Sequence, residues 1–386
     1  MRWKRPEPMQ NVVVSRLGVP DAVLARARRA ARDVCDAAAE LGGALDVDAD
    51  EILTGRAALL GLAPAGRISA GGATRLLATQ DGWCALTLSR GDDVETVPAL
   101  LGMDTSPTDH WSAVTAAAAD RDAAEFVARA RLLDLPAAVL DEVSPAAPRF
   151  MRTGVRATRA MSALLVADLS SLWAGPLCGH LLAAAGATVV KVESPRRPDG
   201  TRRGDPRFFD WMNASKLSYA TDFHDHDVRR LLEAADVVIE GSRPAALARH
   251  GLAAEQVRGR PGRVWLRITG YGTEGECADR VAFGDDAAVA GGLVAAGPSF
   301  VGDAIADPLT GLAAAQALLD SLRRGGGETV DVALAEVAAD YATSPLTVDP
   351  QSHEVSRLPT LPKSAAELGE DNQRVHALIE SRLTPC

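Results

Sequence analysis

Residues 162–340 alternate between short apolar runs and helix-like segments, and this alternation constrains the fold more than any other feature. The run SALLVADLS (162–170) indicates a strand, PLCGHLLAAAGA (176–187) a helix, and TVVKVE (188–193) a second strand. A strand, a helix and a strand in this order form a βαβ unit, which implies a parallel sheet. Further strands are predicted at 236–241, 263–270 and 328–334, and a further helix at 308–323. The pattern predicts an α/β fold whose large domain is an open, doubly wound, Rossmann-like and mostly parallel sheet.

The first 160 residues have a different texture. A helical pattern begins at Val23 and stops at Gly42, DGWCALTLSR (81–90) indicates a turn and a strand, and two more helical segments are expected at 111–133 and 136–142. A stretch rich in Pro, Arg and Thr then resembles a linker. We therefore predict a smaller α+β domain (1–144), a linker (145–160), the Rossmann-like domain (161–343) and an extended C-terminal tail with one short helix (344–386).

Length and charge limit the classes of function. A chain of 386 residues suits two domains. Its formal net charge of −10 opposes binding to nucleic acid or to an anionic membrane surface. The five cysteines have no CxxC spacing, and no apolar run reaches the length of a membrane span. We expect a cytoplasmic protein without a bound metal, a nucleic-acid partner or a membrane partner.

Ligands of open α/β sheets bind beyond the carboxyl ends of the strands, where Leu172, Trp173 and Ala174 follow the first strand. These residues are candidate walls for a nucleotide-like group, although Trp173 could equally pack over the sheet edge. Glu193 ends the second strand where a nicotinamide enzyme places its ribose-binding acid, but the preceding loop lacks the required glycines. GYGTEG (270–275) matches GxGxxG without a helix pattern after it, which disfavours a nicotinamide oxidoreductase.

Other charged residues have simpler interpretations when taken one at a time. Several cations follow the strands and could bind phosphates, but a place on the solvated surface explains any one of them. They are Arg196, Arg197, Arg202, Arg203, Lys216, Arg243 and Arg249. Asp285 and Asp286 are expected in a solvated turn, as are His224 and His226, whose spacing is unusual for metal ligands on a helix.

The segment GDAIADPLTG (302–311) carries two carboxylates just before a long helix pattern. Asp307 precedes Pro308, and Asp at the N-cap with Pro at the first helical position is a common helix start. The spacing alone favours this capping role, with Asp303 in a turn. A carboxylate at a helix N-terminus is also held ionised by the helix dipole, and an ionised carboxylate can act as a nucleophile.

Five segments in order resemble the large domain of the class III CoA-transferases, the CaiB/BaiF family. They are DLSSLWAGPLCGHLLAAAGATVVKVES, ADVVIEGSRPAALARHGL, WLRITGYGTEGECADR, GDAIADPLTGLAAAQALL and GGGETVDVALAEVAA. The family includes formyl-CoA transferase and alpha-methylacyl-CoA racemase. The resemblance implies that Asp307 is the nucleophile, attacking an acyl-CoA thioester to give a mixed anhydride and then an aspartyl-CoA thioester. It also implies acyl-CoA and a carboxylic acid as substrates, no tightly bound cofactor, and a homodimer.

The same resemblance suggests residues for CoA. Leu172, Ala174 and Arg249 match positions that line the CoA site, and Lys216 matches a CoA-binding cation. Trp173 stands where formyl-CoA transferase has a glutamine that helps to position the intermediates.

Racemases of the family have a histidine where this chain has Gly284. This difference disfavours racemisation unless Asp285 or Asp286 replaces the imidazole.

The order of the domains departs from the family, because a segment that resembles its small domain precedes the Rossmann-like part. The chain therefore looks like a rearranged member, and the small domain could complete the active site in the same subunit or across a dimer. We expect an acyl-CoA:carboxylate CoA-transferase. The alternatives are an acyl-CoA racemase or isomerase of the same fold, and a CoA-binding protein without turnover. The sequence leaves the acyl donor and the acceptor acid open.

Overall fold

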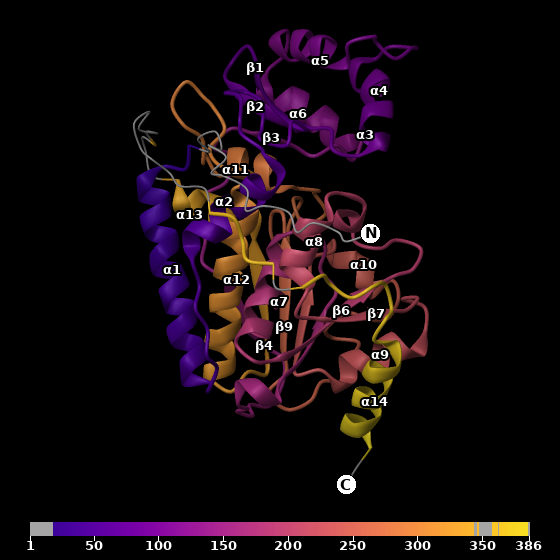
Figure 1. The fold of residues 1–386 in the computed structure, drawn as a ribbon. Helices are drawn as coiled ribbons and strands as arrows, with labels where there is room; N and C mark the ends of the chain where they lie inside the picture. The colour runs from indigo at the N-terminus through magenta and orange to yellow at the C-terminus, as the bar shows by residue number, and fades with distance from the viewer. Residues whose placement is uncertain (1–17, 343–345, 347–356, 362, 385–386) are drawn as a thin grey trace, which may run out of the picture.

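A seven-stranded sheet forms the centre of the larger of two structural units (Figure 1). The computed structural model describes residues 18–342, 346, 357–361 and 363–384. In spatial order the strands are β4 (Arg149–Arg152), β10 (Glu328–Ala333), β9 (Val264–Thr269), β8 (Val237–Glu240), β5 (Leu165–Asp168), β6 (Thr188–Glu193) and β7 (Leu217–Ala220). All neighbouring strands pair in parallel except β4, which is antiparallel to β10. The prediction of an α/β fold with a mostly parallel sheet is confirmed.

The strands are apolar on both sides because both faces of the sheet are covered. In β5, Val166 packs into one apolar core and its neighbours Leu165 and Ala167 pack into the other. The first core lies under α1 (Asp21–Glu40), α2 (Ala49–Leu60), α7 (Ala174–Ala184), α8 (Pro206–Asn213), α11 (Gly284–Ala290), α12 (Ala306–Arg323) and α13 (Leu334–Tyr341). The second lies under α9 (His226–Ala234), α10 (Pro244–Ala248) and α14 (Asn372–Leu383).

The first two helices belong to the larger unit, which differs from the predicted domain of residues 1–144. Helix α1 buries Val23, Ala27 and Ala31 along one face and packs beside α12 (Figure 1). This apolar stripe at helical spacing needs a partner surface, and α12 supplies one. The boundary of the smaller unit therefore falls after α2 rather than at the N-terminus.

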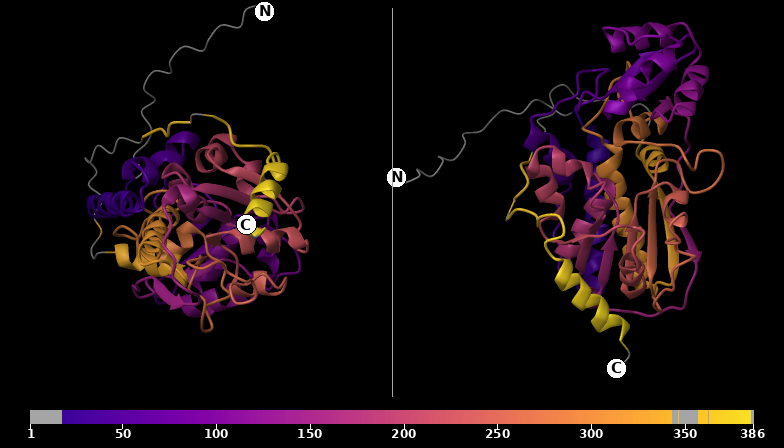
Figure 2. Two further views of the ribbon diagram at one scale, coloured as in Figure 1. Left: turned by 90° about the horizontal axis from the view of Figure 1, so that it is seen from below. Right: turned by 90° about the vertical axis from the view of Figure 1, so that its right-hand side faces the viewer.

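Residues 65–140 form the smaller unit, which sits at one end of the molecule (Figure 2). Its antiparallel sheet has the order β1 (Thr74–Ala78), β2 (Trp83–Thr87) and β3 (Ala137–Val139). Its helices are α3 (Gly91–Glu95), α4 (Val97–Leu101), α5 (His110–Ala119) and α6 (Ala123–Leu132). The helix expected at 136–142 is wrong, because Ala137 and Ala138 pair with β2 and are buried as a strand. The other face of this sheet packs against α11.

The predicted linker and tail both contain elements that pack on the larger unit. Strand β4 lies within residues 145–160 and forms the antiparallel edge of the large sheet. In the C-terminal segment, Val375 and Ile379 of α14 are buried in the second core beside α9. Two short 3-10 helices, at Met161–Ala163 and Gly200–Arg203, complete the described elements.

Candidate active site

Helix α12 carries Asp307 in its first turn. The helix begins at Ala306 after the N-cap residue Ile305, and no side chain caps it. The predicted N-cap role of Asp307 is therefore wrong, because residues 302–305 form a turn and the N–H of Asp307 already bonds to the carbonyl of Ala304 (2.8 Å). The Asp307 side chain is half-buried. Its place in the first turn, at the positive end of the helix dipole, still favours negative charge.

Close packing of α12 on α7 brings Asp307 near the loop that follows β5. A Cβ atom on Gly311 would lie 2.6 Å from Leu177 and 3.0 Å from the carbonyl of Ala174, so a larger residue could not fit without movement. Glycine at this point lets the two helix backbones approach each other closely. The first turn of α12 and the first residue of α7 are thereby held in the same region.

Four aspartates gather here, and we call Asp285, Asp286, Asp303 and Asp307 the acidic cluster. Asp285 and Asp286 lie in the first turn of α11. Asp286 is fully buried under the smaller unit, where its Oδ1 accepts bonds from the Thr87 hydroxyl and from the backbone N–H of Phe283 (both 3.0 Å). The predicted solvated turn is wrong for this pair, because the small sheet covers α11.

The smaller unit of the same chain also reaches Asp285. Asp285 accepts a hydrogen bond from the backbone N–H of Ala304 (3.0 Å), and the Ser69 side chain bonds to it as well. The hydroxyl of Thr74 lies 3.4 Å from its Oδ2. Ser69 in the loop before β1 and Thr74 at the start of β1 therefore contact the acidic cluster from the smaller unit of the same chain.

Burial raises the pKa of each carboxyl in the acidic cluster. The pKa of Asp285 rises to about 6 and that of Asp286 to about 8, in both cases chiefly through burial, with neighbouring carboxylates adding to it. The pKa of Asp307 rises to about 7 through burial, with Asp285 and Asp303 adding and Arg56 opposing. Strongly raised carboxyl pKa values that gather in one place are typical of functional sites.

Arg56 of α2 supplies the positive charge beside these carboxyls. Its Nη1 lies 2.6 Å from Oδ1 of Asp303, whose side chain is almost fully buried. The guanidinium carbon also lies 5.4 Å from the ring centroids of both Trp173 and Phe208. No motif or spacing around Arg56 could have identified it before the fold was known.

Gly284 lies directly against Asp307. A Cβ atom at residue 284 would be 2.6 Å from Oδ2 of Asp307 and would also overlap the carbonyl of Ala304. The backbone N–H of Gly284 donates a hydrogen bond to the Asp307 carboxylate, which favours its ionised form. The backbone approaches the carboxylate here because no side chain intervenes.

A second group of buried charges lies at the carboxyl ends of β5 and β6, and we call Asp168, Lys191, Asp199 and Lys216 the paired cluster. Lys191 pairs with Asp199 at 2.8 Å, and Lys216 pairs with Asp168 at 2.7 Å. Lys216 also donates to the carbonyl of Pro176 (2.8 Å) and has no exposed side-chain surface. Lys216, predicted to contact CoA, is thus enclosed in an internal ion pair.

The paired cluster fixes the loop between β5 and α7. Asp168 accepts hydrogen bonds from Ser170, Lys191 donates to the Ser170 carbonyl, and Asp199 accepts from the backbone N–H of Leu172 (3.2 Å). Leu172 has a positive φ of 72° and is 39% exposed. A left-handed backbone at leucine is strained, so these bonds hold the loop in an unusual conformation.

The other predicted CoA residues fall into two places. Trp173 is buried, packs edge-on against Phe208 (ring centroids 5.3 Å apart) and has an indole N–H without a partner among the described residues. Ala174 is the first residue of α7. Arg249 is exposed at the end of α10, which follows β8. The structure brings Leu172, Trp173 and Ala174 together in one loop, while Arg249 comes from a separate helix.

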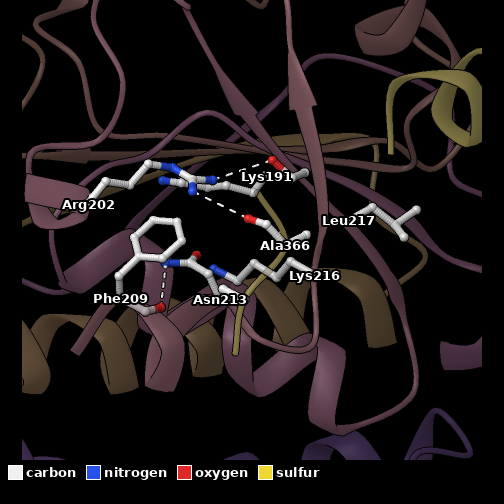
Figure 3. A pocket seen from close by; sticks show the side chains of 9 residues that line it. Lys191, Arg202, Phe209, Asn213, Lys216, Leu217 and Ala366 are labelled. Atoms are coloured by element: carbon white, nitrogen blue, oxygen red, sulfur yellow. Dashed lines mark hydrogen bonds between the residues drawn. The ribbon is translucent and has the colours of Figure 1, made fainter. Parts of the chain in front are cut away.

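Glu193 serves an internal ion pair rather than a free binding position. Arg202 binds it (2.7 Å), and the backbone N–H of Asp199 donates to it (2.9 Å). Figure 3 shows the Arg202 guanidinium above Phe209, with a hydrogen bond to the carbonyl of Ala366, in the lining of a small hollow that includes Lys191 and Lys216.

Two further sequence candidates lie outside any assembled site. GYGTEG is followed by turns, and the next helix begins at Gly284. His224 and His226 are exposed. Within the described ranges, no group of three or more His, Cys, Asp or Glu side chains is arranged to hold a metal ion, and no helix is long and apolar enough to cross a membrane.

A groove of about 680 Å³ lies elsewhere, between α1, α12, α13 and residues 145–150. Its lining includes Arg26, Gln316 and Tyr341. The residues that α12 contributes, such as Gln316, come from its later turns rather than from the first turn that carries Asp307.

Comparison with known proteins places this site in a family. The model of CoA-transferase family III matches residues 161–364, more than half of the chain. The chain belongs to CoA-transferase family III. The match includes all four aspartates of the acidic cluster and all four residues of the paired cluster, but not Arg56.

Curated relatives carry transferase names. The chain is 32% identical over 203 residues to a succinyl-CoA–D-citramalate CoA-transferase of Chloroflexus aurantiacus, covering 47% of this chain and 50% of that protein. It is 34% identical over 207 residues to a succinate–glutarate CoA-transferase of Agrobacterium fabrum, covering 46% and 51%. A solved CAIB/BAIF family protein of Brucella suis is 31% identical with a TM-score of 0.43, covering 47% and 54%. The chain spans about half the length of the curated relatives that it matches.

Proposed function

We propose that this protein is an acyl-CoA:carboxylate CoA-transferase with Asp307 as its nucleophile. The observation that carries the proposal is a half-buried carboxylate in the first turn of α12, with a raised pKa and a backbone N–H directed at it, inside the family-matched segment. A carboxylate with a pKa of about 7 is substantially ionised at neutral pH and is only partly solvated, which suits a nucleophile.

In the proposed reaction an oxygen of Asp307 attacks the thioester carbonyl carbon. The C–S bond breaks, CoA leaves as a thiolate with the electron pair, and Asp307 holds the acyl group as a mixed anhydride. The thiolate then attacks the aspartyl carbonyl and releases the acyl group as a free carboxylate, leaving an aspartyl-CoA thioester. The carboxylate of the acceptor acid then attacks the aspartyl-CoA thioester, which gives a second mixed anhydride and a CoA thiolate. This thiolate attacks the acceptor's acyl carbon, so the new acyl-CoA leaves and Asp307 is a free carboxylate again. Splitting the exchange into covalent steps avoids a direct reaction between a thioester and a weakly nucleophilic acid.

The proposed CoA site lies along the carboxyl ends of the strands, in a Rossmann-like, doubly wound arrangement. Leu172, Trp173 and Ala174 would form its wall, and the exposed Arg249 would meet phosphate oxygens. Lys216 would support this wall through the paired cluster, because its ammonium group is enclosed.

The proposal includes dicarboxylic acids as the first substrates to test, because the two relatives above are named for succinyl-CoA or succinate and a second dicarboxylic acid. A homodimer and a cytoplasmic location remain predictions from the resemblance. Size-exclusion chromatography with light scattering tests the first of these.

Mass spectrometry of the protein after incubation with succinyl-CoA, followed by hydroxylamine, tests the function. We expect a hydroxylamine-sensitive adduct on Asp307, and transfer of CoA to glutarate or citramalate. Asp307→Asn should abolish the adduct and lower turnover by roughly 10⁴-fold or more, as expected for loss of a nucleophile. An adduct that persists in Asp307→Asn would overturn the assignment. If CoA binds without any adduct, the protein is a CoA-binding protein without turnover.

An acyl-CoA isomerase or racemase is the second candidate, and the carboxyl of Asp285 next to Asp307 is the observation that favours it. Asp285 is half-buried and burial raises its pKa to about 6, so it could exchange a proton near neutral pH. Against it, the space at Gly284 leaves no room for the histidine of family racemases. Deuterium exchange at Cα of a bound acyl-CoA, without CoA transfer, would support this candidate.

A further inference from the structure

Arg56 lies outside the segment that the family model matches, and its guanidinium nevertheless reaches the acidic cluster. Within the described ranges, it is the one cation that forms an ion pair with a member of that cluster. Four carboxyls that share a buried region repel one another, so a single positive charge there strongly affects which of them ionises. The position of Arg56 therefore affects whether Asp307 is ionised.

The surroundings hold the guanidinium in place. Asp303 binds Nη1 at 2.6 Å from a buried position, and the aromatic rings of Trp173 and Phe208 lie 5.4 Å from the guanidinium carbon. Trp173 in turn belongs to the loop that the paired cluster fixes. An arginine held by a buried carboxylate and by aromatic contacts is a fixed charge rather than a mobile surface side chain.

We propose that Arg56 is a positioning residue for the nucleophile: fixed by Asp303 against Trp173 and Phe208, it supplies the positive charge that keeps Asp307 available as a carboxylate. This inference rests on the proposed role of Asp307.

The arrangement suits a nucleophile because the ion pair forms on Asp303 and not on Asp307. A guanidinium bound directly to Asp307 would occupy the oxygen lone pairs needed for attack. Held on Asp303, it acts through the electric field and leaves the reacting oxygens free. Among the influences on Asp307, Arg56 is the largest that lowers its pKa, opposing burial and the charges of Asp285 and Asp303.

Two readouts on the full-length protein test this proposal. The first needs no substrate: a carbodiimide couples glycine ethyl ester to protonated carboxyl groups, and peptide fragmentation locates the product on Asp307 as the pH is varied. We expect half-maximal coupling near pH 7 in the unsubstituted protein, as its pKa of about 7 requires. Arg56→Gln should move this midpoint upward by about one pH unit or more, whereas Arg56→Lys should stay close to the unsubstituted protein.

The second readout is the rate of adduct formation with succinyl-CoA as a function of pH. Arg56→Gln should react more slowly at neutral pH and recover at higher pH, where Asp307 ionises without help. Arg67→Gln is the matched control, because Arg67 is an exposed arginine stacked on Trp83, with its guanidinium carbon 4.3 Å from the ring centroid. This control should change neither midpoint.

The outcomes separate the two proposals. If the unsubstituted protein forms no adduct, the nucleophile proposal fails, while the coupling midpoint still decides whether Arg56 controls the charge of Asp307. An unchanged midpoint in Arg56→Gln, or an equal loss of rate at every pH, would overturn the role of Arg56. If Arg56→Gln does not fold, Arg56→Met keeps the apolar stem against the aromatic rings and takes its place.

Discussion

The acidic cluster and the paired cluster are both groups of buried charges near the loop that follows β5, yet they differ in charge balance. In the paired cluster, two lysines meet two aspartates at 2.7–2.8 Å. In the acidic cluster, four aspartates have one ion pair among the described residues, the one between Arg56 and Asp303. Burial acts on both groups, but only a balanced group can remain fully ionised at moderate cost.

The pKa values differ accordingly. The pKa of Asp199 is lowered despite burial, because Lys191 attracts its proton-free form. The pKa of Asp286 instead rises to about 8, and one of its oxygens has no hydrogen-bond partner within the described structure. Balanced charges thus support the backbone of the loop, whereas unbalanced ones keep carboxyls ready to gain or lose protons. This difference supports a structural role for the paired cluster and agrees with the proposed chemical role of Asp307 in the acidic cluster.

Breaking the paired cluster should have the largest effect on stability. Lys216→Met leaves Asp168 as an unpaired charge in the interior, and we expect a loss of about 3–5 kcal/mol in the free energy of unfolding. Urea denaturation measures it. The double variant Lys216→Met with Asp168→Asn removes both charges and should recover part of the loss. A cost below about 1 kcal/mol for the single variant would show that the ion pair is not structural.

Neutralising one aspartate in each cluster should change stability in opposite directions. Asp286 keeps a proton in the folded protein up to about pH 8, whereas the unfolded chain releases it near 3.8, so the folded state loses stability as the pH rises between these values. Asp286→Asn removes this loss and should stabilise the protein by a few kcal/mol at about pH 8, with little effect at about pH 4.

Asp199 has the opposite linkage. Its lowered pKa contributes stability above the unfolded value of 3.8, and that stability disappears as the pH falls through the folded pKa. Asp199→Asn should therefore destabilise the protein at about pH 8. Urea denaturation of Asp286→Asn and Asp199→Asn at several pH values tests these two opposite effects on stability. If both variants changed the free energy of unfolding in the same direction at alkaline pH, the distinction between the two clusters would be contradicted.

The next effect concerns the backbone approach to Asp307. Gly284→Ala places a methyl group 2.6 Å from Asp307 Oδ2, so we expect a loss of about 1–3 kcal/mol from steric strain and a slower reaction of Asp307. Gly82→Ala is the control, since no atom lies within 4 Å of its added Cβ. Thermal unfolding and the rate of adduct formation measure the two effects. Equal behaviour of both variants would show that the contact at Gly284 has no role.

The local pattern of apolar residues was enough to identify the strands and helices of the large sheet, but it did not indicate which distant segments pack together. Strands at 188–193 and 328–334 and the helix near 308–323 follow from alternating apolar runs, and they occur within a residue or two of those bounds. The strand at Ala137–Val139 was missed because a three-residue apolar run next to a helix has no distinguishing period. The association of α1 with α12 depends on a contact between segments almost 300 residues apart.

The same limit applies to the candidate site. Asp307 was identifiable because its motif is local, and its role as nucleophile remains a prediction. Arg56 was not identifiable, since its partner Asp303 lies 247 positions away. Asp286 was misjudged as solvated because nothing in FGDD indicates that a sheet from residues 74–139 covers it. Burial of charged residues is a property of the assembled fold, whereas motifs are a property of the chain.

The smallest expected effect concerns Leu172, whose backbone the paired cluster holds through Asp199. A positive φ costs a leucine about 1 kcal/mol that glycine does not incur, so Leu172→Gly should leave stability unchanged or raise it by up to about 1 kcal/mol. Leu172→Val adds a β-branched side chain to the same backbone and should lower stability instead. Urea denaturation of both variants, alone and together with Asp199→Asn, compares them. If glycine and valine destabilise equally, the Leu172 side chain rather than its backbone conformation determines the stability of the loop. If Asp199→Asn removes the difference between them, the paired cluster is what imposes the strained conformation.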